Sequence, residues 1–251
     1  MIPSPHEHPL LRVVTWNIHK GVQGLGPARR LEIQNIGHAI EQLDADLVCL
    51  QEVRFVNRRE QKRFVHWPEQ PQADFLAPEG YQPVYRTNAV TRHGEHGNAL
   101  LSRWPVLSHQ HEDMSDHRFE QRGLLHTEVH LAGRTVHALV VHLGLIPGSR
   151  ERQVAQLKAY IAREIPAHEP VVVAGDFNEW GPRLTTLLAQ AGLHELAGAR
   201  VPTYPSRLPL TQLDHVYARG LRPVSCMVPQ GRIWRRMSDH LPLVAEFTWL
   251  D

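Results

Sequence analysis

The stretch Val171-Val172-Val173-Ala174-Gly175-Asp176-Phe177-Asn178 decides the fold prediction for this chain of 251 residues. Its first four residues are small and apolar, as in a strand that is covered on both faces. Gly175 permits a turn or a close backbone approach. Asp176 and Asn178 follow at the carboxyl end of the strand, where sheet proteins often place functional residues. An Asp in such a position is by itself more often a turn former or a helix cap.

The same pattern, an apolar strand followed by polar residues, recurs along the chain. Residues 11–16 lead into Asn17, residues 46–50 into Gln51-Glu52, and residues 135–141 into His142. Two runs near the C-terminus add two Asp and two His, namely Asp214, His215, Asp239 and His240. Amides, carboxylates and imidazoles that converge at one rim of a sheet suit a hard divalent cation and a scissile phosphate.

In this order the motifs resemble the endonuclease/exonuclease/phosphatase superfamily. The resemblance rests on Trp-Asn (16–17), Gln-Glu (51–52), Gly-Asn-Ala-Leu-Leu-Ser-Arg (97–103), His-Leu-Gly (142–144), Gly-Asp-Phe-Asn (175–178), Leu-Asp-His-Val-Tyr (213–217) and Ser-Asp-His-Leu-Pro (238–242). Each motif alone is weak, but their order and spacing are specific. The run Asn-Ile-His-Lys-Gly (17–21) is most similar to a bacterial group of small stand-alone members. The resemblance implies an α/β fold, a four-layer α-β-β-α sandwich of two packed mixed sheets flanked by helices.

Length and composition are consistent with one large α/β domain over residues 11–251, after a flexible segment 1–10. The formal net charge of +1 gives no strong field for a polyanion. Cys49 and Cys226 lie in apolar runs and are expected in the core, whereas most of the 18 histidines are expected on the surface. We expect a cytoplasmic protein, because the N-terminus lacks a signal-peptide pattern and no run approaches the ~20 apolar residues of a membrane span.

Apolar residues at helical spacing predict three helices, over residues 29–43, 149–165 and 182–191. Ser149 is the expected N-cap of the second, while Pro182 begins and Gly192 ends the third. Ala132-Gly133-Arg134 is the expected turn of a hairpin. The polar and proline-rich segment 54–80 is expected to be a surface excursion.

The resemblance implies that Glu52 binds one Mg²⁺ or Mn²⁺ ion, with Asn17 and Asp239 assisting. A Glu directly after a buried strand is costly unless it binds a cation or hydrogen-bond donors. A salt bridge to an arginine is the alternative. His19 departs from the AP endonucleases, which carry a metal-binding Asp at this position. Because a histidine cannot replace a hard oxygen ligand, we expect His19 to contact phosphate oxygens instead.

Matching family positions also imply catalytic roles. Asp176 would orient and deprotonate the attacking water, and Asn178 would hold that water or a phosphate oxygen. His240 would donate a hydrogen bond or a proton to the phosphate, with Asp214 fixing its tautomer and raising its pKa. His142 matches a residue that contacts the scissile phosphate.

Four further side chains are weaker candidates for substrate binding. Arg122 matches a phosphate-contacting arginine, and Asn98 matches a family motif but alternatively ties loops together. In the loop 231–237, Trp234 and Arg235 would stack on a base or sugar and grip a second phosphate. The alternative is that Trp234 packs on the core while the arginines stay solvated. His215 is expected to point to the strand face opposite Asp214.

The sequence therefore predicts a divalent-metal-dependent phosphodiesterase that cleaves P–O bonds by in-line water attack. A nuclease, either endonuclease or exonuclease, is the leading version, so the expected partner is a phosphodiester substrate, including nucleic acid; no protein partner is implied. A phospholipid or phosphoinositide phosphoesterase is the alternative, because the fold does not select the substrate. A catalytically silent binding module is more remote, since every expected catalytic residue type is present. The chain contains no Gly-x-Ser-x-Gly elbow and no Walker A loop.

Overall fold

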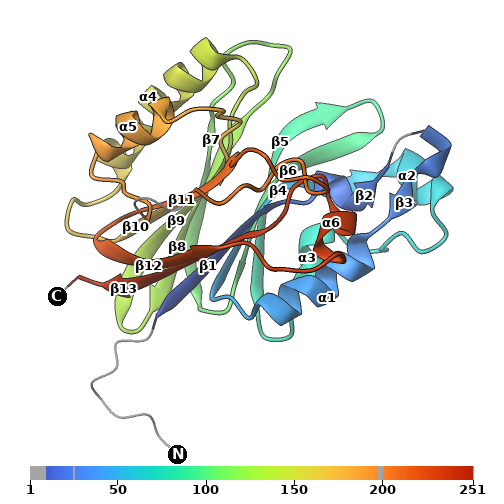
Figure 1. The fold of residues 1–251 in the computed structure, drawn as a ribbon, viewed down its shortest axis with the longest axis horizontal. Coiled ribbons are helices and arrows are strands. Elements are labelled where there is room, and N and C mark those ends of the chain that lie inside the picture. Colours follow the sequence, from blue (N-terminus) through green and yellow to red (C-terminus); the bar gives the residue numbers. More distant parts are fainter. Residues whose placement is uncertain (1–9, 25, 197–199, 251) are drawn as a thin grey trace, which may run out of the picture.

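The computed structural model describes residues 10–24, 26–196 and 200–250. These residues form two β-sheets with helices on their outer faces (Figure 1). The predicted four-layer α-β-β-α sandwich is confirmed. Apart from Leu10, the predicted flexible segment 1–10 lies outside the described residues. No helix in the described ranges is both long enough and apolar enough to cross a membrane.

The first sheet brings Asn17 and Glu52 to one edge. Its strands lie in the order β12-β13-β1-β4-β6-β5. β1 and β4 are parallel, and Asn17 at the carboxyl end of β1 pairs with Gln51, which directly precedes Glu52 at an irregularity in the middle of β4. The bounds are β1 (Leu11–Asn17), β4 (Leu47–Asn57), β5 (Gln82–Thr91), β6 (Gly94–Ser102), β12 (Leu221–Met227) and β13 (Leu243–Trp249).

The second sheet aligns three of the predicted site residues in register. Its strands lie in the order β11-β10-β9-β8-β7. Asp176 on β10 pairs with His142 on the parallel strand β9 and with Asp214 on the antiparallel strand β11. The bounds are β7 (Val106–Asp113), β8 (Gly123–Leu131), β9 (Arg134–His142), β10 (Val171–Asp176) and β11 (Asp214–Arg219).

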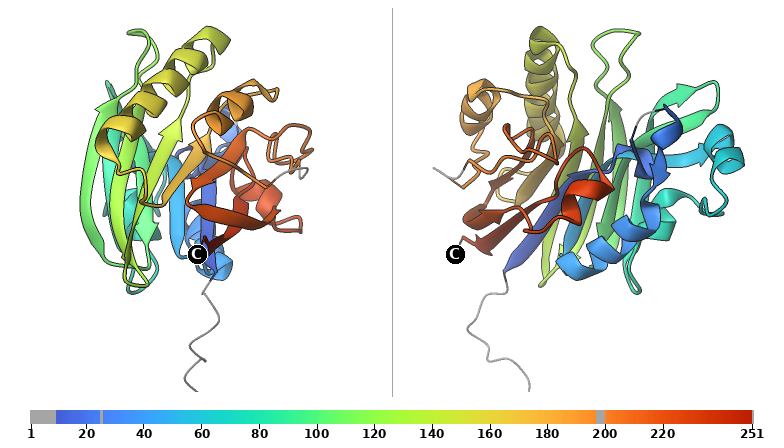
Figure 2. Two further views of the ribbon diagram at one scale, coloured as in Figure 1. Left: turned by 90° about the vertical axis from the view of Figure 1, so that its left-hand side faces the viewer. Right: turned by 45° about the vertical axis from the view of Figure 1, so that its right-hand side comes forward.

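Apolar side chains fill three layers, one between the sheets and one beneath each set of helices. The first sheet is covered by α1 (Ile33–Leu43), α3 (Gln72–Leu76) and α6 (Trp234–Met237). The second is covered by α4 (Pro147–Glu164) and α5 (Arg183–Ala189). The right-hand view of Figure 2 shows α1 and α4 on opposite sides of the strands. The thiols of Cys49 and Cys226 are free and pack in or against the layer between the sheets, as predicted.

The three predicted helices are present as α1, α4 and α5, among six α-helices in the described residues, but their ends differ from the prediction. α1 begins at Ile33 rather than at residue 29, because residues 30–31 form the short strand β3 (Arg30–Leu31) against β2 (Val22–Gln23). Ser149 is not the N-cap of α4: the helix begins at Pro147, and the Ser149 hydroxyl donates to Asp116 at 2.6 Å. The hairpin turn is confirmed, with Ala132 and Gly133 in the left-handed region.

The segment 54–80 is more structured than predicted. β4 continues to Asn57, whose side chain accepts a hydrogen bond from the Glu60 N–H and so caps α2 (Arg58–Arg63). Further on, Gln72 is buried at the start of α3. Its side chain donates to the Lys20 carbonyl (2.9 Å) and thereby supports the backbone beside Glu52.

Gly175→Ala tests the close approach of β10 to β9. A Cβ at residue 175 would lie 1.9 Å from the Val141 carbonyl oxygen, so a buried backbone would have to move. We expect urea unfolding to show a loss of about 3 kcal/mol or more. Gly37→Ala in α1 is the matched control. Its Cβ would contact only Leu76, at 3.9 Å, so the substitution should raise the free energy of unfolding by up to ~1 kcal/mol. Equal stability of the two variants would refute the packing argument.

Candidate active site

The Asp176 carboxylate lies at the centre of the candidate active site and is 1% exposed. Its Oδ2 accepts a hydrogen bond from Asn17 Nδ2 of the other sheet (3.1 Å), and its Oδ1 accepts one from the Asn178 N–H (2.9 Å). The Nε2 atoms of His142 and His240 each lie 3.6 Å from Asp176 Oδ2. One carboxylate therefore brings together residues from both sheets.

His240 is held from three sides. Its Nδ1 lies 2.8 Å from Asp214 Oδ2, the same oxygen to which Thr203 Oγ1 donates at 2.6 Å. The Tyr204 ring packs against the imidazole with the ring centroids 4.9 Å apart. Trp16 Nε1 donates to the His240 carbonyl (3.0 Å). The predicted pairing of His240 with Asp214 is thus present, and it leaves Nε2 directed at Asp176.

The two histidines beside Asp176 differ in charge. Burial acts to lower the pKa of His240, but the carboxylates of Asp214 and Asp176 outweigh burial and raise it to about 10. Burial lowers the pKa of His142 to about 4, with the positive charge of Arg122 acting in the same direction. At neutral pH His240 is therefore an imidazolium and His142 a neutral imidazole.

Glu52 forms an ion pair with Lys20, whose Nζ lies 2.6 Å from Glu52 Oε2. Both residues have left-handed backbones, with φ of 57° for Glu52 and 63° for Lys20. Such strain in non-glycine residues is concentrated at functional sites. Burial acts to raise the pKa of Glu52, but nearby positive charges, above all that of Lys20, lower the pKa well below its usual range. The salt-bridge partner of Glu52 is thus a lysine and not an arginine.

The predicted metal ligands Glu52, Asp239 and Asn17 fit a hard divalent cation in their chemistry. They offer two carboxylates and one amide oxygen, and the Glu52 carboxylate already attracts a cation. Asp239 Oδ1 lies 3.5 Å from His19 Nδ1, and Asn17 Oδ1 accepts from the His19 N–H (3.0 Å). Oxygen donors of this kind are those that Mg²⁺ and Mn²⁺ prefer.

A second set of ligand atoms, from Asp176, Asp214 and His240, lies within 4.8 Å of one another. These atoms already satisfy one another: the His240 imidazolium lies between the two carboxylates. The ligand atoms of this set are thus engaged with one another, whereas Glu52 is paired with the Lys20 ammonium.

The Arg122 guanidinium and the Asn98 side-chain nitrogen are engaged within the protein, whereas Asn98 Oδ1 is buried without a hydrogen-bond partner among the described residues. Arg122 Nε donates to the Leu143 carbonyl (3.1 Å), and its guanidinium pairs with Glu120 (3.0 Å). Asn98 is fully buried, and its Nδ2 donates to the carbonyls of Gly123 (2.9 Å) and Val140 (3.1 Å). Asn98 thus ties β6 of the first sheet to the second sheet, which favours its structural alternative over substrate contact.

Trp234 packs on the core, so the prediction that it stacks on substrate is wrong. Its side chain is 8% exposed, and its ring centroid lies 6.2 Å from that of Trp16. The single turn of α6 directs Trp234 to the sheet and leaves Arg235 exposed. Arg235 remains available to a ligand.

Lys20, Thr203 and Tyr204 complete the site but were not among the predicted residues. Lys20 lies in the run Asn-Ile-His-Lys-Gly, and it is one of only three lysines, so the sequence carried a signal for it. Thr203 and Tyr204 lie in a loop without a recognisable motif and reach Asp214 and His240 through the fold.

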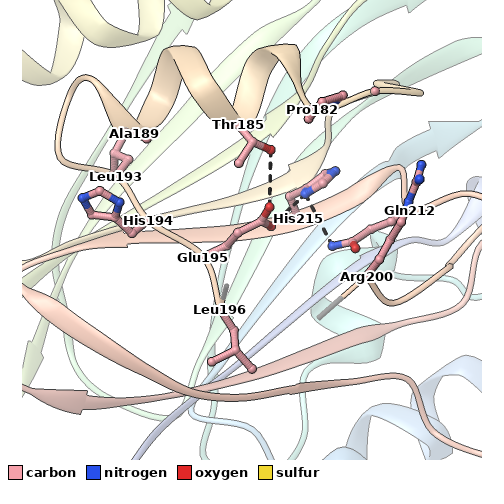
Figure 3. Close-up of a pocket in the computed structure, with 11 residues that line it drawn as sticks. Pro182, Thr185, Ala189, Leu193, His194, Glu195, Leu196, Arg200, Gln212 and His215 are labelled. Carbon is pink, nitrogen blue, oxygen red and sulfur yellow. Dashed lines mark hydrogen bonds and ion pairs between the residues drawn. The ribbon is translucent and has the colours of Figure 1, made fainter. Parts of the chain in front are cut away.

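His215 points away from Asp214, as predicted. It faces α5, where its Nδ1 lies 2.9 Å from Glu195 Oε2 and its ring packs against Phe177 and Tyr217. Figure 3 shows the hollow on this side of β11, with a volume of about 490 Å³ and with Thr185, Glu195, Arg200, Gln212 and His215 in its lining. This hollow lies on the other face of the strand and is separate from the Asp176 site.

Residues 14–240 match the sequence profile of the Endonuclease/Exonuclease/phosphatase family. The chain belongs to this family. Its members are generally hydrolases that act on phosphoester bonds and depend on divalent metal ions.

Similar proteins are found over the whole length of the chain. The uncharacterized protein YbhP of Escherichia coli is 36% identical over 253 residues, which cover 98% of this chain and 99% of YbhP. An endonuclease/exonuclease/phosphatase protein of Beutenbergia cavernae superposes with a TM-score of 0.78 at 22% identity, over 96% of this chain and 72% of that one. TDP2 of D. rerio, solved with a single-strand DNA product, superposes with a TM-score of 0.67 at 16% identity. The match covers 95% of this chain and 99% of that one. The two structures support the fold alone.

Trp234→Ala should act through stability. We expect a loss of about 3 kcal/mol in the free energy of unfolding, because a large buried ring is removed from its contact with Trp16. Arg235→Ala, at the exposed neighbouring position, should change stability by less than ~0.5 kcal/mol. Chemical unfolding of both variants measures this difference. An unchanged stability of Trp234→Ala would show that the ring is not a core element.

Proposed function

We propose that the chain is a divalent-metal-dependent phosphodiesterase, with nucleic acid as its leading substrate class. The observation that carries the proposal is the pairing of a buried carboxylate, Asp176, with an imidazolium, His240, beside the oxygen ligands led by Glu52. This arrangement offers a proton acceptor, a proton donor and a cation site at one edge of the two sheets. When bound at Glu52, Asp239 and Asn17, a Mg²⁺ or Mn²⁺ ion supplies neutralisation of the charge on the phosphate oxygens.

Asp176 accepts the proton of the attacking water. The hydrogen bonds from Asn17 and from the Asn178 N–H fix the carboxylate before substrate binds, so little reorganisation is needed. The Asn178 side chain is itself oriented by its bond to the Leu143 carbonyl (2.9 Å). It therefore presents its amide at a defined position next to the reacting water or a phosphate oxygen.

His240 donates from Nε2 to a phosphate oxygen. Its Nδ1 is bound to Asp214, so Nε2–H is the free donor, and the positive ring stabilises the charge that develops on the phosphate. Neutral His142, on the opposite side of Asp176, contributes a second contact without further positive charge. His19 and Arg235 complete the proposed phosphate contacts. Arg122 can contact a phosphate only if its ion pair with Glu120 breaks.

Three observations bear on the substrate. Arg232, Arg235 and Arg236 are exposed on the loop that leads to His240, which favours a substrate with several phosphates. A solved relative in fold, TDP2, holds a single-strand DNA product. Exposed aliphatic residues near the site, Leu145, Leu208 and Leu210, instead favour a phospholipid as the second candidate, because aliphatic side chains do not stack on bases.

Activity should disappear in excess chelator and return with Mg²⁺ or Mn²⁺, with Ca²⁺ less effective. Glu52→Gln should raise the metal concentration needed for half-maximal activity, since the main anionic ligand is lost. Glu41→Gln, at an exposed position on α1, is the control. A panel of plasmid DNA, single-stranded DNA and RNA, bis-p-nitrophenyl phosphate, sphingomyelin and inositol phosphates identifies the substrate. Full activity without any divalent ion would end the metal assignment.

Asp176→Asn and His240→Ala should each lower kcat by at least ~10²-fold, the usual scale for a positioned acid or base. Asp214→Asn should cost less, because Asp214 orients His240 without touching substrate. Asp74→Asn on the exposed face of α3 is the charge-matched control. Steady-state kinetics on the best substrate decide the matter, and a fully active Asp176→Asn enzyme would disprove its role. For a nucleic acid, binding should also weaken as salt rises.

A further inference from the structure

A chain of buried polar groups lies under α4, apart from the candidate active site. Tyr160 OH lies 2.9 Å from His126 Nδ1, His126 Nε2 lies 2.8 Å from His137 Nδ1, and His137 Nε2 lies 2.5 Å from Glu169 Oε2. The two histidines are 2% and 3% exposed, so they are not among the histidines expected on the surface. His137 is five residues before His142 on β9, about 16 Å along the strand.

The hydrogen bonds of these polar groups allow two arrangements of protons. Glu169 only accepts, so His137 carries its proton on Nε2. Tyr160 OH lies 2.9 Å from His126 Nδ1 and 3.3 Å from Gln110 Oε1, and its single proton goes to only one of them. When it goes to His126, His126 Nε2–H donates to His137 Nδ1. When it goes to Gln110, the neutral rings turn two lone pairs toward each other at 2.8 Å, and a cation is needed between them.

That cation is either a proton or a metal ion, and the surroundings favour a metal ion. Glu128 pairs with His137 across β8 and β9, and one carboxylate oxygen of Glu128 and one nitrogen of each histidine lie within 4.8 Å of one another. The far nitrogens are held by Tyr160 and Glu169, as metal-bound histidines are held by partners outside the metal site.

We propose that His126 Nε2, His137 Nδ1 and the Glu128 carboxylate bind one Zn²⁺ ion, separate from the Glu52 site. Two imidazoles and a carboxylate form a known zinc ligand set that leaves a fourth position for water. Zinc–nitrogen bonds of ~2.0–2.1 Å at a tetrahedral angle place the nitrogens about 3.3 Å apart, so the rings must separate by about 0.5 Å. Glu128 is only partly buried and gives the ion a route from solvent.

Zinc binding is measured in excess Mg²⁺, which occupies the Glu52 site, on chelator-treated protein that carries His240→Gln, so that neither the Glu52 group nor the Asp176 cluster contributes. We expect one Zn²⁺ per chain by calorimetry, and a tetrahedral visible absorption band with Co²⁺. His126→Gln and His137→Gln should each abolish both signals, and Glu169→Gln should weaken binding by ~10–100-fold. His130→Gln, at an exposed position on β8, is the matched control and should bind as before. Phosphodiesterase activity, measured with native His240, should survive His126→Gln.

Several results would overturn the site. Absence of tight zinc binding, or unchanged binding by His126→Gln, would mean that the two rings share a proton. If the histidine variants do not fold, the zinc K-edge spectrum of the His240→Gln protein replaces them. It should show two imidazole ligands and one carboxylate, and any other count of imidazoles would contradict the assignment. Activity and zinc binding are read separately, so failure of the proposed phosphodiesterase function leaves this test intact.

Discussion

The hydrogen bond from Asn17 Nδ2 to Asp176 Oδ2 is the contact on which the candidate active site depends, because it joins the polar ends of the two sheets. A carboxylate buried to this extent is costly unless its oxygens are bonded. Asn17 meets that requirement from one sheet and the Asn178 N–H from the other. His142 and His240 then lie at equal distances from the same oxygen, and the Asp176 carboxylate acts to raise the pKa of both. The charge of His240 follows from the additional carboxylate of Asp214, and the neutrality of His142 follows from burial and the charge of Arg122.

Strand periodicity and register account for most of what the sequence predicted. Asp176, His142 and Asp214 meet because their strands end in register, and a strand end can be recognised from an apolar run followed by a polar residue. Asn17 joins them only because one sheet packs on the other. Strand periodicity does not predict this packing; it is expected because the order of the motifs resembles that of a known family.

The predictions that failed concern side chains whose direction is set by local backbone geometry. Trp234 is buried because one helical turn directs it to the sheet, and the sequence of that loop has no periodicity from which to infer the direction. The Lys20–Glu52 ion pair joins two residues with left-handed backbones, and the Gln72 side chain donates to the Lys20 carbonyl; the sequence indicates none of these features. The number of histidines in the sequence does not indicate that His126 and His137 are buried. Their burial follows from their position beneath α4. Their nitrogens suit zinc, whereas the oxygens around Glu52 suit magnesium.

The proposed activity depends on where the cation binds. Anomalous diffraction from a crystal of the protein soaked in Mn²⁺ distinguishes the two groups of candidate ligands. We expect a peak at the Glu52 carboxylate, with the Lys20 ammonium displaced from it and the bond between His240 and Asp214 intact. A peak among Asp176, Asp214 and His240, with Lys20 still on Glu52, would contradict this proposal.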